Sequence, residues 1–441
     1  MVQACGDRRR VIEDRLWEDG IVVAFHIKSW KRQFFRTYFP RKRFYFAPLH
    51  LSKREFLRRI LPCLSDRQKP VVFVWGNNLP DFVSDAIDRL GIDTYHVEDG
   101  FVRSLKSHAG YSLPISLTLD RQRPYFDSRG PSDLEDLLRN HNFDADPALI
   151  TRAREGIETF LKMRITKYND RSGVAAELSA SETGSRRKIL VIGQVEDDAS
   201  IQYGSEKVRT NNELIEIAAA ENPGAEILYK PHPDVLSGVR REISCPDDLA
   251  YLCTILRAHA PLPDVLESAD HVYTITSLAG FEALLRGKKV TTVGAPFYSG
   301  WGLTDDRQQI ARRDRKLSIE EIFAGAYILY PFYYQTNAEL CSMEQAFKDV
   351  STLTPDHYAL QPQHTRWKLS GTYGLLGWRR LLTPLLSKII EMVATEEDAR
   401  LYRLDPAAFF HELSEKKYRV LAHVLYPRAN VTVEARPWLD L

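Results

Sequence analysis

The chain is 441 residues long, with 44% hydrophobic and 27% charged residues and a formal net charge of +1 at pH 7. This composition is that of an ordinary globular protein, and the length allows two or three domains that each bury a core. The balanced charge argues against wholesale binding of nucleic acid. The five scattered cysteines include no C-x-x-C pair, so the sequence supports neither a zinc site nor a disulfide framework.

The start of the chain shows no targeting signal. Its first ten residues turn basic without an apolar core, so we expect no secretory signal. No apolar run approaches the roughly 20 residues needed to span a bilayer. We therefore expect a cytoplasmic protein whose membrane association, if any, is peripheral.

A basic and aromatic segment follows between His26 and Arg59, with eleven Lys or Arg residues and one acid, Glu55. Such a segment can lie on an anionic membrane surface. Nucleic acid is the rival partner, and we expect none because the overall charge is balanced. The plainer alternative is a solvated helix face whose aromatics belong to the core. The aromatics are Trp30, Phe34, Phe35, Tyr38, Phe39, Phe44, Tyr45 and Phe46.

Strands alternate with helical stretches over most of the chain, which predicts an α/β protein with parallel sheets. In the first half we expect strands at 21–25, 70–76 and 93–97, a helix at 81–90 that ends at Gly91, and a loop at 98–101. Ser132 is a good helix cap, and a long helical stretch runs from it to about Lys167. In the second half we expect strands at 188–192, 226–230, 271–275 and 289–293, and helices at 212–220, 248–259 and 278–286.

The best linker lies at 169–187, a stretch poor in large apolar groups and rich in Ser, Gly and charge. It separates two expected Rossmann-like domains, at 15–168 and 188–350, and a helical extension follows at 351–441. Two such domains with a cleft between them are the plan of a GT-B-like nucleotide-sugar enzyme, an inference from architecture alone. We assign the acceptor to the first domain and the nucleotide to the second.

The most informative stretch runs from Gly193 to Asp198 and directly follows the strand at 188–192. A strand that ends in Gly and then delivers three carboxylates indicates a site, since ligands bind beyond the carboxyl ends of parallel strands. The alternative is a solvated loop in which an Asp caps the next helix.

Two further segments favour phosphate binding. Lys230-Pro231-His232-Pro233 follows a strand, and the prolines bias Lys230 and His232 toward extended geometry, which suits a fixed contact of the imidazole to a phosphate oxygen. At 274–285, Thr276 or Ser277 would cap a helix whose free amides attract anions. Gly280 would let a ligand approach the first turn. Glu282 could accept hydrogen bonds from ribose hydroxyls, or simply favour the helix N-terminus.

With these segments in place, the chain resembles the bacterial capsule polysaccharide β-Kdo transferases of the KpsC/LipA type. The resemblance covers roughly residues 20–350. Its matching segments are 29–32, 97–104, 194–201, 230–233, 276–288 and 296–304. Family members transfer Kdo, an eight-carbon acidic sugar, from CMP-β-Kdo to a glycolipid primer at the cytoplasmic face of the inner membrane, with retention of configuration.

The resemblance implies a mechanism and its residues. Retention is most simply two displacements through a covalent sugar–enzyme adduct, which needs a carboxylate nucleophile. By resemblance this is Asp198, with Asp197 as the alternative, and Glu98 is the candidate general base. The leaving phosphate is a weak base, so electrostatic stabilisation suffices and we expect neither cofactor nor metal.

The remaining site residues fall into two groups. The nucleotide would be bound by Lys230, His232, Pro233, Ser277, Gly280 and Glu282. The acceptor or the sugar carboxylate would be bound by Asp99, Arg103 and Arg209, with Lys230 as a further cation for the carboxylate. The acceptor would be a glycolipid or a Kdo-terminated saccharide.

The chain departs from the family in carrying one module where the capsule enzymes carry two in tandem. It is therefore expected to make one linkage, or to serve another Kdo-containing polymer. Two other functions stay open: a CDP-alditol-dependent polyol-phosphate transferase of the teichoic-acid type, and a non-catalytic capsule export factor. The first needs no nucleophilic carboxylate on the sugar side, so the acidic run favours Kdo transfer.

Overall fold

The computed structural model describes residues 16–66, 69–105, 113–169 and 186–354 except 237, 239, 258 and 259, and part of 384–420. By their internal contacts the residues divide into two compact units. One comprises Met1–Glu18, Val74–Asn77 and Asp93–Tyr358, and the other comprises Asp19–Phe73, Asn78–Ile92 and Ala359–Leu441. Most of the expected linker at 169–187 and of the expected extension at 351–441 lies outside the described residues.

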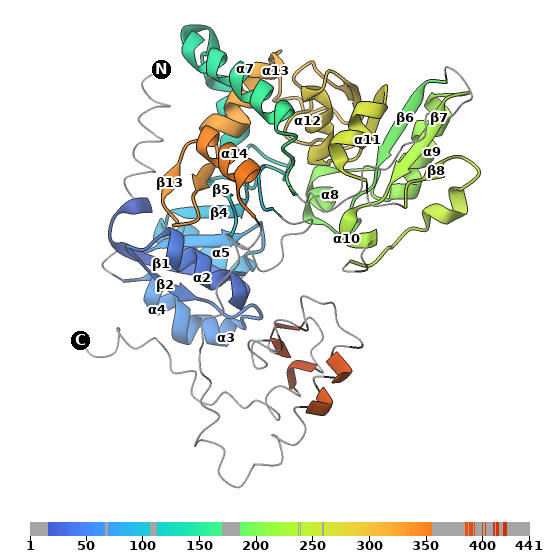
Figure 1. Cartoon of the computed structure of the whole chain (residues 1–441). Helices are drawn as coiled ribbons and strands as arrows, with labels where there is room; N and C mark the ends of the chain where they lie inside the picture. Colours follow the sequence, from blue (N-terminus) through green and yellow to red (C-terminus); the bar gives the residue numbers. More distant parts are fainter. Residues whose placement is uncertain are drawn as a thin grey trace. The chain divides into compact units, whose positions relative to one another are not determined.

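A six-stranded sheet in the first unit has the order β11-β10-β9-β6-β7-β8. Figure 1 labels three of its strands, β6, β7 and β8. All its neighbouring strands are parallel, as predicted. Their carboxyl ends therefore lie along one edge, where such sheets bind ligands. The strands are β6 (Lys188–Ile192), β7 (Glu226–Lys230), β8 (Thr254–Ile255), β9 (His271–Thr274), β10 (Lys289–Thr292) and β11 (Asp305–Asp306).

Helices cover both faces of this sheet. Successive side chains of a strand point to opposite faces, so β6 contributes to two cores. Ile189 and Val191 pack in the core that contains the apolar residues of α9 (Asn211–Glu221). Leu190 and Ile192 pack in the other, which contains apolar residues of α11 (Leu262–Ser268) and α12 (Leu278–Leu285). The short helices α8 (Ala199–Gly204) and α10 (Pro233–Leu236) follow β6 and β7.

A second group of strands in the same unit has the order β13-β12-β5-β4, and its pairs are antiparallel. The expectation of parallel sheets is wrong here, because the chain turns back after β4 through Gly100, whose N–H donates to the Ser116 carbonyl over 2.9 Å. β12 and β13 follow the six-stranded sheet in the chain, and β12 pairs with β5 and with β13. The strands are β4 (Thr94–Asp99), β5 (Ser116–Asp120), β12 (Phe332–Tyr334) and β13 (Leu340–Cys341).

Two helical predictions are corrected. The stretch from Ser132 to Lys167 forms α6 (Asp133–Asn140), which Ser132 caps as predicted, and α7 (Pro147–Lys162). The break falls before Pro147, because proline fits only the first turn of a helix. The helix expected at 248–259 is replaced by a 3₁₀ turn (Pro246–Leu249) and β8, which pairs with β7 at the edge of the sheet. The remaining helices of this unit are a 3₁₀ turn (Phe143–Ala145), α13 (Ile319–Phe323), a π-helix (Ala324–Leu329) and α14 (Met343–Thr352).

In the second unit the basic and aromatic segment forms part of the core. Phe34, Phe35, Tyr38 and Phe39 are buried, as the plainer alternative proposed. β1 and β2 are parallel neighbours, and β3 leaves this unit after Phe73. The elements are β1 (Gly20–Phe25), α2 (Ser29–Tyr38), β2 (Lys42–Phe46), α3 (Lys53–Glu55), a π-helix (Phe56–Ile60), α4 (Leu61–Leu64), β3 (Val71–Trp75) and α5 (Asp81–Leu90).

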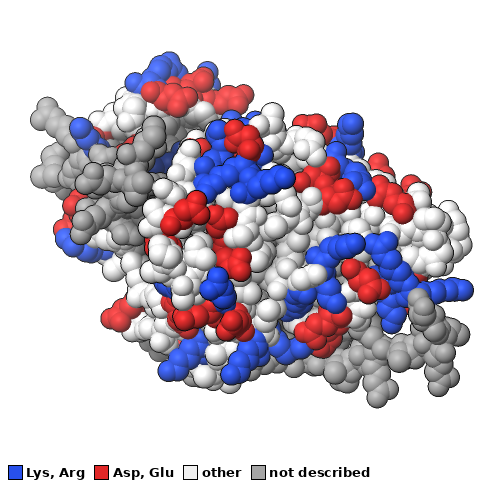
Figure 2. Space-filling view, turned by 90° about the horizontal axis from the view of Figure 1, so that it is seen from above, with Lys and Arg blue, Asp and Glu red and all other residues white. Residues whose placement is uncertain are grey.

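Charge on the molecular surface is mixed. On the face seen in Figure 2, acidic and basic residues are interspersed, in keeping with 60 Lys and Arg against 59 Asp and Glu. In the part of the chain that the structure describes, no helix is both long enough and apolar enough to cross a bilayer. The same residues include no group of three His, Cys, Asp or Glu side chains placed to hold a metal ion.

Candidate active site

The carboxyl ends of β6, β7 and β9 bring three of the segments singled out in the sequence to one edge of the sheet. The N–H of Gly193 donates to the carbonyl of Lys230 over 2.8 Å. The side chain of Gln194 reaches the third segment, since its Nε2 donates to Thr276 Oγ1 over 3.0 Å and its Oε1 accepts from Thr276 N over 2.8 Å. The acidic run, the His-Pro loop and the start of α12 therefore meet.

Glu196, the first acid of the run, holds two loops together. It is buried, and its carboxylate accepts from Asn211 N over 2.5 Å, from Ser244 N over 2.7 Å and from the Ser244 hydroxyl. These bonds fix the start of α9 and the loop before the 3₁₀ turn. Three donors leave this carboxylate little capacity for a ligand.

The next two acids are exposed and differ in their partners. Asp197 Oδ1 lies 2.7 Å from Nη2 of Arg240. Asp198 caps α8, where its Oδ1 accepts from Ser200 N over 2.8 Å. The cap that the sequence suggested as an alternative function is thus present. It also orients the Asp198 carboxylate while leaving the side chain accessible to a ligand.

His232 presents one ring nitrogen to the protein and keeps the other for a partner. Its Nδ1 accepts from the Asp234 N–H over 3.1 Å, so in the neutral ring Nε2 carries the proton and can donate. Burial lowers the pKa of His232, although Asp234 and Asp198 act in the opposite direction. The influence of Asp198 places the acidic run within electrostatic reach of this imidazole.

Two of the three cations expected to bind the sugar carboxylate are bonded to the protein. Lys230 is buried, its Nζ donates to the Ala260 carbonyl over 3.0 Å, and burial lowers its pKa. Arg103 is fully buried, and its Nε lies 2.7 Å from Asp99 Oδ1. Arg209 is exposed just before α9. Lys230 and Arg103 are therefore already engaged by protein groups.

The N-terminus of α12 is capped as the sequence predicted, by Ser277, whose Oγ accepts from Ala279 N over 3.2 Å. The expectation that Gly280 admits a ligand is wrong. A Cβ on Gly280 would lie 2.1 Å from Oη of Tyr298, which itself donates to the Ser277 carbonyl over 2.5 Å. Gly280 is therefore required by the close packing of Tyr298 against α12.

Glu282 points into the protein, with only 1% of its surface exposed. Its Oε1 accepts from the Lys167 N–H over 3.2 Å. Burial raises the pKa of Glu282 from 4.5 to about 7, against the influence of Arg286 and Lys167. The carboxyl thus joins α12 to the segment after α7, and its surroundings are those of a buried structural group. Pro233, also expected in the nucleotide site, is the first residue of α10.

Glu98 and Asp99 are the last two residues of β4, where the sequence predicted a loop. Both are half-buried. Asp99 is paired with Arg103, and burial together with the charges of Glu98 and Asp99 raises the pKa of the Tyr125 hydroxyl. A second sheet therefore contributes its own pair of carboxylates at a strand end.

Lys167 lies near these carboxylates, although no motif in the sequence pointed to it. It follows α7 and is half-buried. Burial alone would lower its pKa, but Tyr168, Tyr125, Asp99 and Asp198 together raise it. Lys167 therefore interacts electrostatically with Asp99 at the end of β4 and with Asp198 of the acidic run. No motif surrounds Lys167, so the sequence offered no signal for it.

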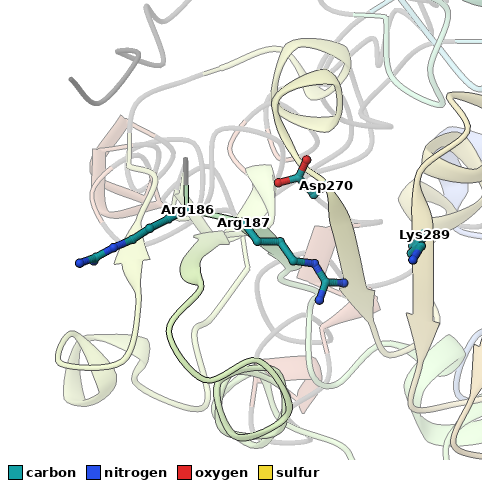
Figure 3. Close-up of a pocket in the computed structure, with 4 residues that line it drawn as sticks. All are labelled: Arg186, Arg187, Asp270 and Lys289. Atoms are coloured by element: carbon teal, nitrogen blue, oxygen red, sulfur yellow. The ribbon is translucent and has the colours of Figure 1, made fainter. Parts of the chain in front are cut away.

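A hollow elsewhere on the six-stranded sheet is not this site (Figure 3). It is lined by Arg186, Arg187, Asp270 and Lys289, which lie at or next to the starts of β6, β9 and β10. Because these strands are parallel, their starts lie at the edge opposite the acidic run and the His-Pro loop. Arg187 Nη2 is held 2.8 Å from Nδ1 of His271.

Solved structures share this fold. The chain is similar to the β-Kdo 2,7 transferase of Thermosulfurimonas dismutans KpsC, with 32% identity, a TM-score of 0.59, and 76% of this chain and 99% of that chain covered. It is also similar to the β-Kdo 2,4 transferase of the same protein, with 27% identity, a TM-score of 0.63, and coverage of 75% and 97%. The two sheets and their helices define a GT-B-like α/β protein.

The sequence places the chain more narrowly. The chain belongs to the family of capsule polysaccharide biosynthesis proteins, whose model matches residues 71–333. It is 44% identical over 314 residues to the lipopolysaccharide-processing protein LpsZ of Rhizobium meliloti, covering 71% of this chain and 70% of that protein. It is 40% identical over 323 residues to the capsule polysaccharide modification protein LipA of Neisseria meningitidis, but spans only 43% of LipA.

Proposed function

We propose that the protein transfers Kdo from CMP-β-Kdo to a glycolipid or Kdo-terminated acceptor in the synthesis of a capsule or related surface polysaccharide. The observation that carries the proposal is the likeness to two solved β-Kdo transferases over nearly their whole lengths, at 32% and 27% identity. The meeting of the acidic run, the His-Pro loop and α12 at one sheet edge supports it. The anomeric configuration is retained in this proposal.

Asp198 is the proposed nucleophile. A carboxylate oxygen of Asp198 attacks C2 of the sugar, the bond from C2 to the phosphate oxygen breaks, and CMP leaves with the electron pair. The capping bond to Ser200 N holds the carboxylate in one orientation, which favours attack from a fixed direction. Asp197 is the weaker candidate, because it would first have to leave its ion pair with Arg240.

His232 and the N-terminus of α12 are proposed to stabilise the leaving phosphate. The Nε2–H of neutral His232 donates to a phosphate oxygen, and the free amides at the start of α12, after Ser277, favour an anion. The phosphate is already a weak base, so the proposal includes neither a metal nor a cofactor. Glu98 accepts the proton of the acceptor hydroxyl as that oxygen attacks C2 and releases Asp198.

Peripheral contact with the inner-membrane face is part of the same proposal, because a glycolipid acceptor would be anchored there. The buried aromatics of the basic segment belong to the core, but Arg36, Arg43, Lys53, Arg54 and Arg58 are exposed. We expect these cations to bind anionic vesicles, more weakly as salt rises. Co-sedimentation that is unchanged by salt and by lipid charge would contradict this part.

The test is transfer from CMP-Kdo to a Kdo-terminated primer, followed by mass spectrometry, with D198A and D197A compared with the wild type. Loss of the nucleophile should lower turnover at least about 10³-fold in D198A while CMP still binds. D197A, the matched neighbour, should keep most of its activity. Normal turnover by D198A would refute the assignment, and an inactive wild type would refute the proposed function.

A further inference from the structure

The backbone of Lys167 is fixed from two sides. Its carbonyl accepts from the N–H groups of Arg103 over 2.9 Å and Ser104 over 3.3 Å, in the segment that follows β4. Its own N–H donates to Glu282 Oε1 of α12 over 3.2 Å. The Cα of Lys167 therefore lies between the strand end that carries Glu98 and Asp99 and the helix whose N-terminus faces the acidic run.

The ammonium of Lys167 is available to a ligand. The Tyr168 ring centroid lies 5.6 Å from Nζ, and within the described ranges no hydrogen bond or ion pair holds this ammonium. The neighbouring cations differ, since Lys230 donates to a carbonyl and Arg103 is paired with a carboxylate. Among the cations of the site that the structure describes, Lys167 is thus the half-buried one that can still accept an anion.

Acidic groups around Lys167 favour its charged form. Asp99 and Asp198 favour the charged form of Lys167, and Lys167 in turn disfavours protonation of His232. Lys167 therefore lies within electrostatic reach of both the proposed nucleophile and the proposed phosphate ligand. A sugar bound between Asp198 and His232 would place the substituents of its reacting carbon near this cation.

We propose that Lys167 binds the carboxylate of the donor sugar, an inference that rests on the proposed function. The carboxylate carbon of Kdo is attached to C2, the carbon that Asp198 attacks. Two anions must therefore approach each other in the first displacement, and a cation between them offsets their repulsion. Lys167 would also give specificity for acidic ketoses over neutral sugars carried by the same nucleotide.

The first experiment compares K167Q and K167R with the wild type, and K162Q serves as the control because Lys162 is exposed at the end of α7. For K167Q we expect the KM for CMP-Kdo to rise at least tenfold, while the Kd for CMP by calorimetry stays within twofold. K167R, which keeps the charge, should recover part of the loss, and K162Q should match the wild type. A wild-type KM in K167Q, or a parallel loss of CMP affinity without rescue in K167R, would overturn the inference.

A second experiment needs no variant. Reductive methylation of the wild-type protein, read by peptide mass spectrometry, reports the accessibility of Lys167. CMP-Kdo should protect Lys167, while CMP alone should not. Equal modification with both ligands would overturn the inference and leave the proposed function intact, provided that the wild type consumes CMP-Kdo. A wild type that leaves CMP-Kdo unchanged would remove the proposed function and the inference together.

Discussion

Glu282→Gln should stabilise the protein at alkaline pH. Glu282 is 1% exposed, and its burial raises the pKa from 4.5 to about 7. Between pH 4.5 and about pH 7, Glu282 loses its proton in the unfolded chain and keeps it in the folded chain. The free energy of unfolding therefore falls as the pH rises through this range. One pKa unit corresponds to about 1.4 kcal/mol, so at pH 8 the buried charge of Glu282 lowers the free energy of unfolding by about 3 kcal/mol. Gln removes the charge and keeps the acceptor for Lys167 N.

The assay is urea unfolding of wild type and E282Q at pH 4.5 and pH 8. At pH 4.5 both side chains are neutral and bury a polar group, so their free energies of unfolding should differ little. At pH 8, E282Q should be the more stable by up to about 3 kcal/mol. Glu216→Gln, on the exposed face of α9, should show no such divergence. A difference between E282Q and wild type that is the same at both pH values would refute the reasoning.

Two further changes test the phosphate contact of His232 and the packing of α12. His232→Ala should weaken CMP binding about 10- to 100-fold, the value of one hydrogen bond to a charged group, and unchanged affinity by calorimetry would exclude the phosphate contact. Gly280→Ala should cost about 1–3 kcal/mol by overpacking against Tyr298, measured by thermal or urea unfolding. Adding Tyr298→Phe to Gly280→Ala should recover part of that loss. If the effects of the two substitutions on the free energy of unfolding simply add, the clash is not its cause.

Much of the fold could be predicted where local sequence determines the element. β6 and β7 have the predicted bounds because their apolar runs are closed by Gly193 and Pro231. α5 ends at Gly91, which adopts the left-handed conformation that glycine favours. β5, β8 and β12 were not predicted, because their pairing depends on residues far away in the chain. β8 and β12 are also only two and three residues long.

The site could be predicted only as a set of segments. The acidic run, the His-Pro loop and α12 could be assigned to one site because the carboxyl ends of parallel strands share one edge of the sheet. The sequence indicated Asp198 by resemblance and kept Asp197 as the alternative. It could not show that Glu196 has a structural role, since the donors that bind Glu196 come from Asn211 and Ser244 in later loops. Lys167 escaped notice because its place depends on backbone bonds to Arg103 and Glu282 rather than on a motif.

The central claim is that Asp198 bonds covalently to the transferred sugar. The most direct measurement is intact-mass analysis of the wild-type enzyme quenched in acid after mixing with CMP-Kdo alone, followed by peptide mapping. We predict one added Kdo on the peptide that contains Asp198, no addition in D198A, and a product with retained configuration. No adduct together with an inverted product, or an adduct on another residue, would contradict the account.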